Sequence, residues 1–239
     1  MLTVDYSLLG IKDGERILDI GCGTGRHSWE ACRQARCVVF ALDIDGDELV
    51  RARGVLSAMD RQGESRGQWG LLRASTVYLP FKEGAFDKIV CSEVLEHVPD
   101  DAESIKEMAR VVKDSGTVAV SVPNQLPEAI CWRISSEYHN RAGGHVRIYR
   151  RGELIEPLNA AGLRVYATRR KHGLHSMYWI CRCIFGVNNE KAFFPSLYHR
   201  FLVWDMKANR RPVRWLEAIL NSFFAKSVVF YATKNKSKR

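Results

Sequence analysis

The chain has 239 residues, of which 46% are hydrophobic and 26% charged, as is typical of a globular protein and not of a disordered one. It contains no apolar run of about 18 residues or more and no basic-then-apolar start, so neither a transmembrane helix nor a signal peptide is expected. The seven cysteines form no Cys-x-x-Cys pair, which predicts free thiols and a cytoplasmic location and argues against a cysteine-based zinc site.

The charge is divided unevenly along the chain. Residues 1–129 contain 15 lysines and arginines against 21 acidic residues, a formal charge of −6. Residues 130–239 contain 21 against 6, a formal charge of +15. A basic half predicts an anionic partner, which could be an anionic substrate, nucleic acid, or an anionic membrane surface that the protein contacts peripherally. A solvated basic face without a partner is the alternative.

The first strong local pattern is a strand, a glycine turn and a helix. The apolar run over residues 16–20 predicts the strand, and the amphipathic stretch over residues 27–35 predicts the helix. Between them Gly21, Gly23 and Gly25 occupy alternate positions. Glycine can take positive φ and lets the backbone lie against a ligand, which the free N–H groups of a helix start would also face. An ordinary glycine turn without a ligand is the alternative.

The glycine spacing and a nearby acid indicate which ligand binds. A dinucleotide fingerprint needs glycine at its sixth position, where this chain has Arg26. Asp19 stands two residues before the first glycine, and its carboxylate suits a cationic sulfonium with an ammonium group better than a pyrophosphate. The segment from Asp19 to Gly25 resembles motif I of the class I S-adenosylmethionine (SAM) methyltransferases. That resemblance implies SAM as the cofactor, bound by Asp19, Gly21, Gly23 and Gly25.

A second acid follows at the tip of the next expected strand, residues 37–42. Asp43 lies 22 residues after Gly21, about the spacing at which an acid accepts ribose hydroxyls in nucleoside-binding βαβ units. The resemblance implies that Asp43 binds the ribose and that the backbone of Ile44 lines the adenine. An N-cap for the following helix is the alternative role, but Asp45 is better placed for it.

Two further segments match the family in order. After an expected strand over residues 70–73, the loop that usually supplies an aspartate to the adenine amino group has Ser75 instead. The run over residues 86–92 predicts the fourth strand. Ligands of doubly wound sheets bind at the carboxyl ends of strands, so Ser92 and Glu93 are expected beside the cofactor.

Glu93, Glu96 and His97 have a spacing that would place them on one side of a helical turn. Two carboxylates and an imidazole could hold a divalent cation, as the resemblance to quinone-pathway O-methyltransferases with a Glu-x-x-Glu-His sequence implies. We prefer the alternative, an ordinary loop with no metal in which His97 orients backbone.

The complete pattern predicts a Rossmann-like, doubly wound sheet of seven strands, mostly parallel with an antiparallel last strand. Residues 1–168 together with 227–239 are expected to form the SAM-binding methyltransferase domain. Residues 169–226 are too long for a plain connection and are rich in aromatic residues and arginine, which predicts a helical insert. That insert would be a lid over the acceptor, a membrane-surface face, or a helical unit with its own core. The remaining elements are expected as helices over 48–59, 101–112 and 151–161, strands over 117–122, 163–168 and 227–233, and a disordered basic tail over 234–239.

The expected activity is SAM-dependent transfer of a methyl group, most readily to a hydroxyl oxygen of a small, lipophilic or saccharide acceptor. A hydroxyl acceptor needs a base, and the candidates are His145, which follows the glycine pair Gly143 and Gly144, and His97. His139, His172 and His175 are alternatives.

Two other functions stay open. The basic half allows an RNA methyltransferase, although the chain has neither an Asn-Pro-Pro-Tyr sequence nor a cysteine-based catalytic motif. The second is a catalytically inactive binding protein that keeps the methyltransferase fold. Intact Asp19 and Asp43 argue against it.

Overall fold

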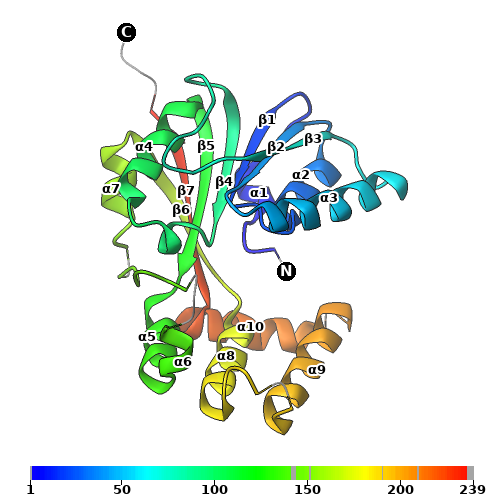
Figure 1. Ribbon diagram of the computed structural model, residues 1–239, viewed down its shortest axis with the longest axis vertical. Helices are drawn as coiled ribbons and strands as arrows, with labels where there is room; N and C mark the ends of the chain where they lie inside the picture. The colour runs from blue at the N-terminus through cyan, green and yellow to red at the C-terminus, as the bar shows by residue number, and fades with distance from the viewer. Residues whose placement is uncertain (1, 141–143, 151, 190, 209, 236–239) are drawn as a thin grey trace. The chain divides into compact units, whose positions relative to one another are not determined.

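The computed structural model describes residues 2–140, 144–150, 152–189, 191–208 and 210–235 (Figure 1). Gly143 of the predicted glycine pair, the start of the helix predicted over 151–161 and the end of the basic tail lie outside the described residues.

The core of the fold is a seven-stranded sheet in the order β3-β2-β1-β4-β5-β7-β6. The pairs β1–β2, β1–β4, β2–β3 and β4–β5 are parallel, and the last strand runs antiparallel, so the predicted fold is confirmed. The order reverses beside β1, where doubly wound sheets bind their ligands. The strands are β1 (Arg16–Ile20), β2 (Val38–Asp43), β3 (Gln68–Arg73), β4 (Phe86–Ser92), β5 (Val112–Pro123), β6 (Leu163–Lys171) and β7 (Ser227–Lys234).

The helices that flank the first strands begin where their sequences supply caps. Asp45 caps α3 (Gly46–Arg61), accepting from the backbone N–H of Asp47 at 2.8 Å, and Asp100 caps α4 (Asp101–Val111) in the same way. The prediction that Asp45 caps this helix is therefore confirmed. The short helix α1 (Tyr6–Leu9) and α2 (Arg26–Gln34) complete this part of the chain.

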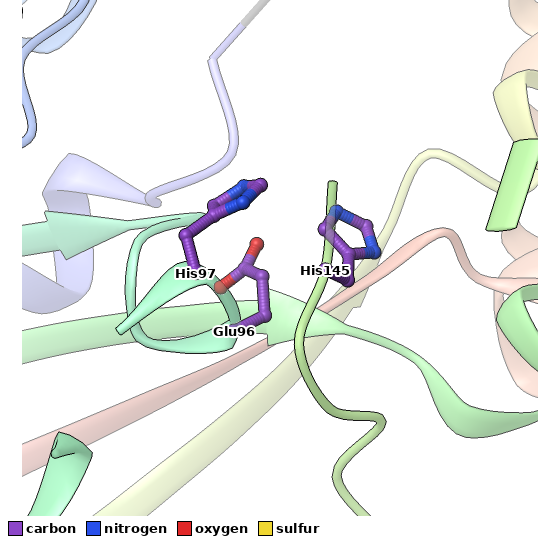
Figure 2. A group of neighbouring side chains, drawn as sticks. All are labelled: Glu96, His97 and His145. Atoms are coloured by element: carbon purple, nitrogen blue, oxygen red, sulfur yellow. The ribbon is translucent and has the colours of Figure 1, made fainter. Parts of the chain in front are cut away.

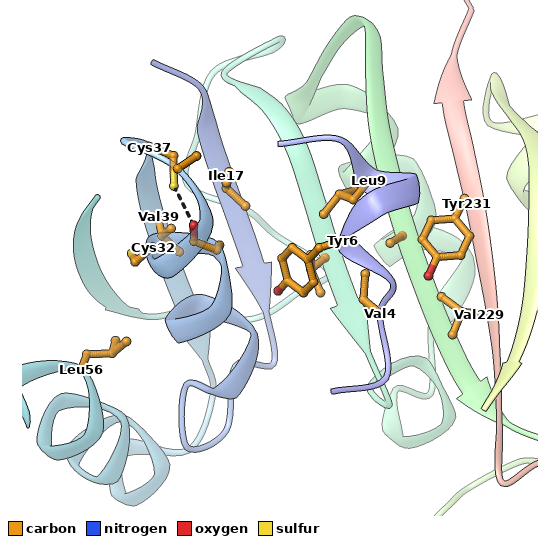
Figure 3. Close-up of a cluster of buried hydrophobic side chains, with 14 of the residues drawn as sticks. Val4, Tyr6, Leu9, Ile17, Cys32, Cys37, Val39, Leu56, Val229 and Tyr231 are labelled. Atoms are coloured by element: carbon orange, nitrogen blue, oxygen red, sulfur yellow. Dashed lines mark hydrogen bonds between the residues drawn. The ribbon is translucent and has the colours of Figure 1, made fainter. Parts of the chain in front are cut away.

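One buried apolar cluster joins the first helix to strands from both halves of the strand order. Leu9 of α1, Ile17 of β1, Val39 of β2, Leu56 of α3 and Tyr231 of β7 are each at most 1% exposed (Figure 3). These side chains hold α2 and α3 against the strands that they follow, and so fix the glycine turn at the end of β1. All seven cysteines are free thiols, as predicted.

The chain divides into two compact units. The first contains residues 1–122, 153–168 and 229–239, with α7 (Ile155–Ala160), and the second contains residues 123–152 and 169–228. Segment 123–152, which the sequence analysis placed with the methyltransferase domain, clusters with the insert. The helices of the second unit are α5 (Gln125–Ile134), α6 (Ser136–His139), α8 (Gly173–Phe185), α9 (Phe193–Ala208) and α10 (Arg211–Phe224). Within the described ranges no helix is long and apolar enough to span a membrane.

Two boundaries differ from the sequence expectation. A strand was expected over residues 117–122, but β5 already begins at Val112 and includes the turn-forming residues 114–116. Its pairing with β4 shifts register between Phe86 and Lys88, so the extra residues are accommodated as a bulge, with Ser115 at φ 62°. The helix predicted over 151–161 is shorter, Ile155–Ala160.

Candidate cofactor and active site

The glycine turn has the backbone conformation that its sequence predicts. Gly21, Gly23 and Gly25 have φ values of 62°, 51° and 81°, all in the left-handed region that favours glycine. At Gly21 the requirement is also steric, because a Cβ there would lie 2.3 Å from Cγ2 of Val94. This turn therefore keeps its shape only with glycine at its first position.

A cavity of about 200 Å³ lies between this turn and the end of β4. Of the predicted site residues, Gly21, Gly23, Ser92 and Glu93 line it. The other four lining residues, which were not among the predicted site residues, belong to the same turn and to the first turn of α2. Their position directly after a glycine-rich strand end was the available signal. They are Cys22, Thr24, Arg26 and His27.

The start of α2 supplies backbone donors beside the cavity. Its N-cap is Gly25, which has no side chain to cap the helix, and the buried Asp19 carboxylate accepts from the backbone N–H of Ser28, the third residue of the helix. The other N–H groups at such a helix start are available to a ligand. Gly25 itself does not line the cavity. A Cβ there would meet Ala52 of α3 at 3.4 Å, an ordinary van der Waals contact, so the φ of 81° and not a lack of space favours glycine at this position.

Asp43 is tied to the glycine turn from the tip of β2. One carboxylate oxygen accepts from the backbone N–H of Gly23 at 2.9 Å, and the other accepts from that of Asp45 at 2.9 Å. The cavity lining includes neither Asp43 nor Ile44 nor Ser75. Ile44 is 66% exposed, and the hydroxyl of Ser75 accepts from the backbone N–H of Val77 at 3.4 Å.

Asp19 is buried behind the turn. Its carboxylate is 2% exposed and accepts a hydrogen bond of 2.6 Å from the Ser28 hydroxyl of α2. Burial raises the pKa of Asp19 from 3.8 to about 6, against the opposing effect of the Ser28 hydrogen bonds. Asp19 does not line the cavity, so in this structure it supports the turn through α2.

The end of β4 is fixed by a small polar network. Glu93 has φ 58°, an uncommon value for a residue with a side chain. Its backbone N–H donates to the carbonyl of Ser121 at 2.9 Å, and its carboxylate accepts from the Ser121 hydroxyl at 3.0 Å. The hydroxyl oxygens of Ser92 and Ser121 lie 2.9 Å apart. Glu93 and Ser92 therefore face the cavity from a fixed strand end.

The expectation that Glu93, Glu96 and His97 share one side of a helical turn is wrong. Only Leu95–His97 is helical, as the 3₁₀ turn η1, and Glu93 precedes it in the left-handed conformation. Figure 2 shows Glu96 and His97 projecting from this turn, with Glu96 fully buried. His145, also drawn there, belongs to the second unit. The predictions of a base at His97 and of a site without metal remain predictions.

His145 is held by a buried carboxylate within the second unit. Its Nδ1 lies 2.6 Å from the carboxylate of Glu128 on α5, and their side chains are 15% and 6% exposed. Glu128 also accepts from the indole N–H of Trp132 at 3.1 Å and the hydroxyl of Tyr138 at 3.2 Å. Burial opposes ionisation of Glu128, but the hydrogen bond and charge of His145 outweigh it and hold the pKa of Glu128 below its ordinary value.

Sequence reasoning did not find Glu128, because this buried acid lies in a segment without a recognisable motif. The alternative histidines have other surroundings. His139 stacks on Trp132 with ring centroids 4.2 Å apart, and His172 is the N-cap of α8. Burial lowers the pKa of His175 to about 4.

Comparison with known proteins identifies the fold and family. A family model described as a methyltransferase domain matches residues 4–168. The chain is 30% identical over 180 residues to a ubiquinone biosynthesis O-methyltransferase of Leptothrix cholodnii, covering 72% of this chain and 74% of that protein. It is 35% identical over 142 residues to the protein of that name from Alkalilimnicola ehrlichii, covering 57% of this chain but only 54% of that protein. The chain thus spans about half the length of the latter.

A crystal structure described as a candidate methyltransferase from Bacillus halodurans superimposes with a TM-score of 0.67. The match covers 97% of both chains at 18% sequence identity. At that identity the likeness shows the fold alone.

Proposed function

This chain belongs to the SAM-dependent methyltransferase family, and from that premise we propose that it methylates a hydroxyl oxygen of a small, lipophilic or saccharide acceptor. The cofactor is that of the family. The choice of a hydroxyl acceptor depends on one observation, the buried pair of Glu128 and His145, because a hydroxyl must lose its proton as the methyl group arrives. The O-methyltransferase names of its relatives support the same choice.

The residues of the first unit fit the cofactor. The turn at Gly21 is a backbone cradle that a Cβ would fill, and Asp43 and Glu93 supply carboxylates at the ends of β2 and β4, the two strands that flank β1. When bound, SAM supplies a methyl group activated by its sulfonium. The carboxylates would favour a cationic ligand, the start of α2 would donate to its carboxylate, and Asp43 would accept from its ribose hydroxyls. The protein then contributes mainly the alignment of the reacting atoms.

His145 is the proposed base and Glu128 its positioning residue. A histidine that donates from Nδ1 to a carboxylate has its basic lone pair at Nε2. His145 would take the hydroxyl proton of the acceptor on Nε2 while the oxygen forms its new bond to the methyl carbon. Glu128 would hold the ring and stabilise the imidazolium, as a buried acid does beside a catalytic histidine. Trp132 and Tyr138 keep the Glu128 carboxylate in place from α5 and α6.

Incubation of the full chain with methyl-labelled SAM and fractionated cell extract tests the proposal. We expect label in a lipid or saccharide fraction, and we expect it to survive mild alkali because methyl ethers are stable where methyl esters are hydrolysed. Alkali-labile label would contradict a hydroxyl acceptor. Label in RNA would identify an RNA methyltransferase. Tight binding of S-adenosylhomocysteine with no labelled fraction would indicate an inactive binding protein.

A further inference from the structure

The helix α10 presents its apolar side outward. None of its residues is buried, although it carries two aromatic and several aliphatic side chains on one stripe. We propose that this outward side of α10 binds the surface of an anionic lipid membrane. This interaction goes beyond methyl transfer and is independent of it.

The first step is the position of the apolar residues. Trp215, Leu216, Ile219 and Phe223 are 71%, 44%, 40% and 67% exposed. Their spacing of i, i+1, i+4 and i+8 places them on one side of the helix. Val213, Leu220 and Phe224 form the adjacent row of the helix surface, are half-buried and attach α10 to its unit. The exposed stripe that includes Trp215 and Phe223 therefore does not contribute to packing α10 against its unit.

The second step is charge. Arg211 and Arg214 are exposed on the first turn of α10, and exposed Arg210 directly precedes it. The only acid on the helix is Glu217, which is half-buried. The second unit as a whole has 16 lysines and arginines against 5 acidic residues, a formal charge of +11. The first unit has 20 against 22, a charge of −2.

The third step is that α9 repeats the pattern in the same unit. Phe193, Leu197 and Trp204 are 71%, 52% and 48% exposed and share one side of α9 with exposed Arg200. Both α9 and α10 pack on α8, as Figure 1 shows. Two helices of one unit thus offer aromatic and aliphatic side chains interspersed with arginine.

These features favour a lipid surface over other partners. Amphipathic helices with Trp, Phe and Leu on one side and arginine beside them lie in the interface of anionic membranes. A second copy of the chain would bring two units of +11 together, which is electrostatically unfavourable. Leu216 and Ile219 have no π-face for stacking a base, so RNA could stack only on Trp215 and Phe223 and would leave the aliphatic part of this surface uncovered.

Co-sedimentation of the full chain with vesicles tests the proposal. We expect binding to vesicles rich in phosphatidylglycerol, weaker binding to vesicles of phosphatidylcholine, and a decrease with added salt. The double variant W215S/F223S should bind at least ~10-fold more weakly, because each side chain loses an apolar contact with the acyl boundary. The control is Tyr78→Ser, since Tyr78 is a 77% exposed aromatic residue of the first unit. This control should bind the vesicles as the unaltered chain does.

A charge-reversal pair tests the arginines. R211E/R214E should lower binding to anionic vesicles ~10-fold or more, at about 1 kcal/mol for each basic residue. R53E/R61E, which changes two exposed arginines of α3, should have little effect. Unchanged affinity for S-adenosylhomocysteine would show that each variant is folded. The proposal is overturned if the unaltered chain does not bind anionic vesicles, or if both arginine pairs behave alike. It is also overturned if W215S/F223S abolishes self-association or RNA binding and leaves vesicle binding intact.

Discussion

Asp19 and Asp43 stand near the ends of neighbouring parallel strands, yet their surroundings give them different chemistry. Asp43 is half-buried and its two oxygens hold backbone N–H groups of Gly23 and Asp45. Asp19 is almost fully buried and has a single described hydrogen-bond donor, Ser28. Part of the Asp43 side chain is therefore exposed to solvent, outside the cavity lining, whereas Asp19 is enclosed behind the turn that it supports.

Asp43→Ala should weaken the binding of S-adenosylhomocysteine by at least ~10-fold, because a charged acceptor of hydrogen bonds contributes about 1.5–3 kcal/mol. Isothermal calorimetry measures the affinity. Asp45→Ala is the matched control, since it removes the neighbouring cap of α3 at a stability cost of about 1 kcal/mol and leaves the Asp43 carboxylate in place. Unchanged affinity in Asp43→Ala would show that the ribose assignment is wrong.

Asp19→Asn should make the protein more stable at neutral pH. Because the folded-state pKa is raised to about 6, the folded protein binds the Asp19 proton more tightly than the unfolded chain does. That stabilisation is complete below about pH 4 and is lost as the pH rises through about 6, where ionisation costs about 3 kcal/mol. Asparagine does not ionise, so it avoids this cost of burying a charge, and its side-chain oxygen can still accept the hydrogen bond from Ser28. Urea unfolding near pH 4 and pH 7.5 should show a gain only at the higher pH, and an equal difference at both would contradict this.

His145→Gln should lower kcat by about 100-fold or more if the histidine is the base, since general-base catalysis contributes that much. Glu128→Gln should lower kcat by less, because the imidazole remains but is no longer held beside a carboxylate. Neither change should alter the affinity for S-adenosylhomocysteine. His139→Gln is the control on the same segment. If His139→Gln lowered kcat as much as His145→Gln does, the assignment of His145 as the base would be wrong.

Among the elements, the glycine turn between β1 and α2 is the one with the narrowest sequence requirement. Gly21→Ala should lower the free energy of unfolding by about 1–2 kcal/mol from its backbone conformation alone, and by more because its methyl group would overlap Val94. Gly10→Ala is the matched control, with φ also 62° and no atom within 4 Å of its added Cβ. Urea titration measures both.

The double variant G21A/V94A separates the two contributions. Truncating Val94 removes the methyl groups that the Cβ added by Gly21→Ala would meet, so the double variant should be less destabilised than the sum of the single changes. Strict additivity would show that the overlap is relieved by movement of the turn.

At the element scale, sequence reasoning succeeded where the signal was local. The alternation of glycines, the apolar strands and the cap at Asp45 are each specified within a few residues, and the structure has them where they were expected. It failed at β5 because residues 114–116 have turn-forming side chains, while pairing with β4 extends the strand through them. It failed at η1 because i, i+3, i+4 spacing implies a shared side only if the backbone is helical throughout.

At the scale of the whole molecule, only part of the candidate site could be predicted from the sequence. The residues that line the cavity come from two short segments, within 21–27 and at 92–93, and half of them were predicted from the sequence. Glu128 was not, because its three partners Trp132, Tyr138 and His145 are brought together by the packing of the second unit. Contacts between segments that contain no motif cannot be predicted from local sequence. A buried acid in such a segment is therefore indistinguishable from an ordinary surface residue.

S-adenosylhomocysteine should stabilise the first unit. At about 100 times its Kd it should add about 2.7 kcal/mol to the free energy of unfolding of the unit that binds it. Hydrogen exchange should slow at the first turn of α2 and at the end of β4, while exchange in α10 should be unchanged. Protection confined to the second unit would contradict placement of the cofactor at the glycine turn.

The chain passes between its two units four times, near residues 122, 152, 168 and 228. The second unit is thus built from two separate inserts into one sheet, and neither insert contains all of its core. Transfer of the second unit to a different methyltransferase would require both pieces, joined at four positions. A chimaera exchanging only the longer piece would leave Cys183 and Val187 of its buried cluster without Cys131.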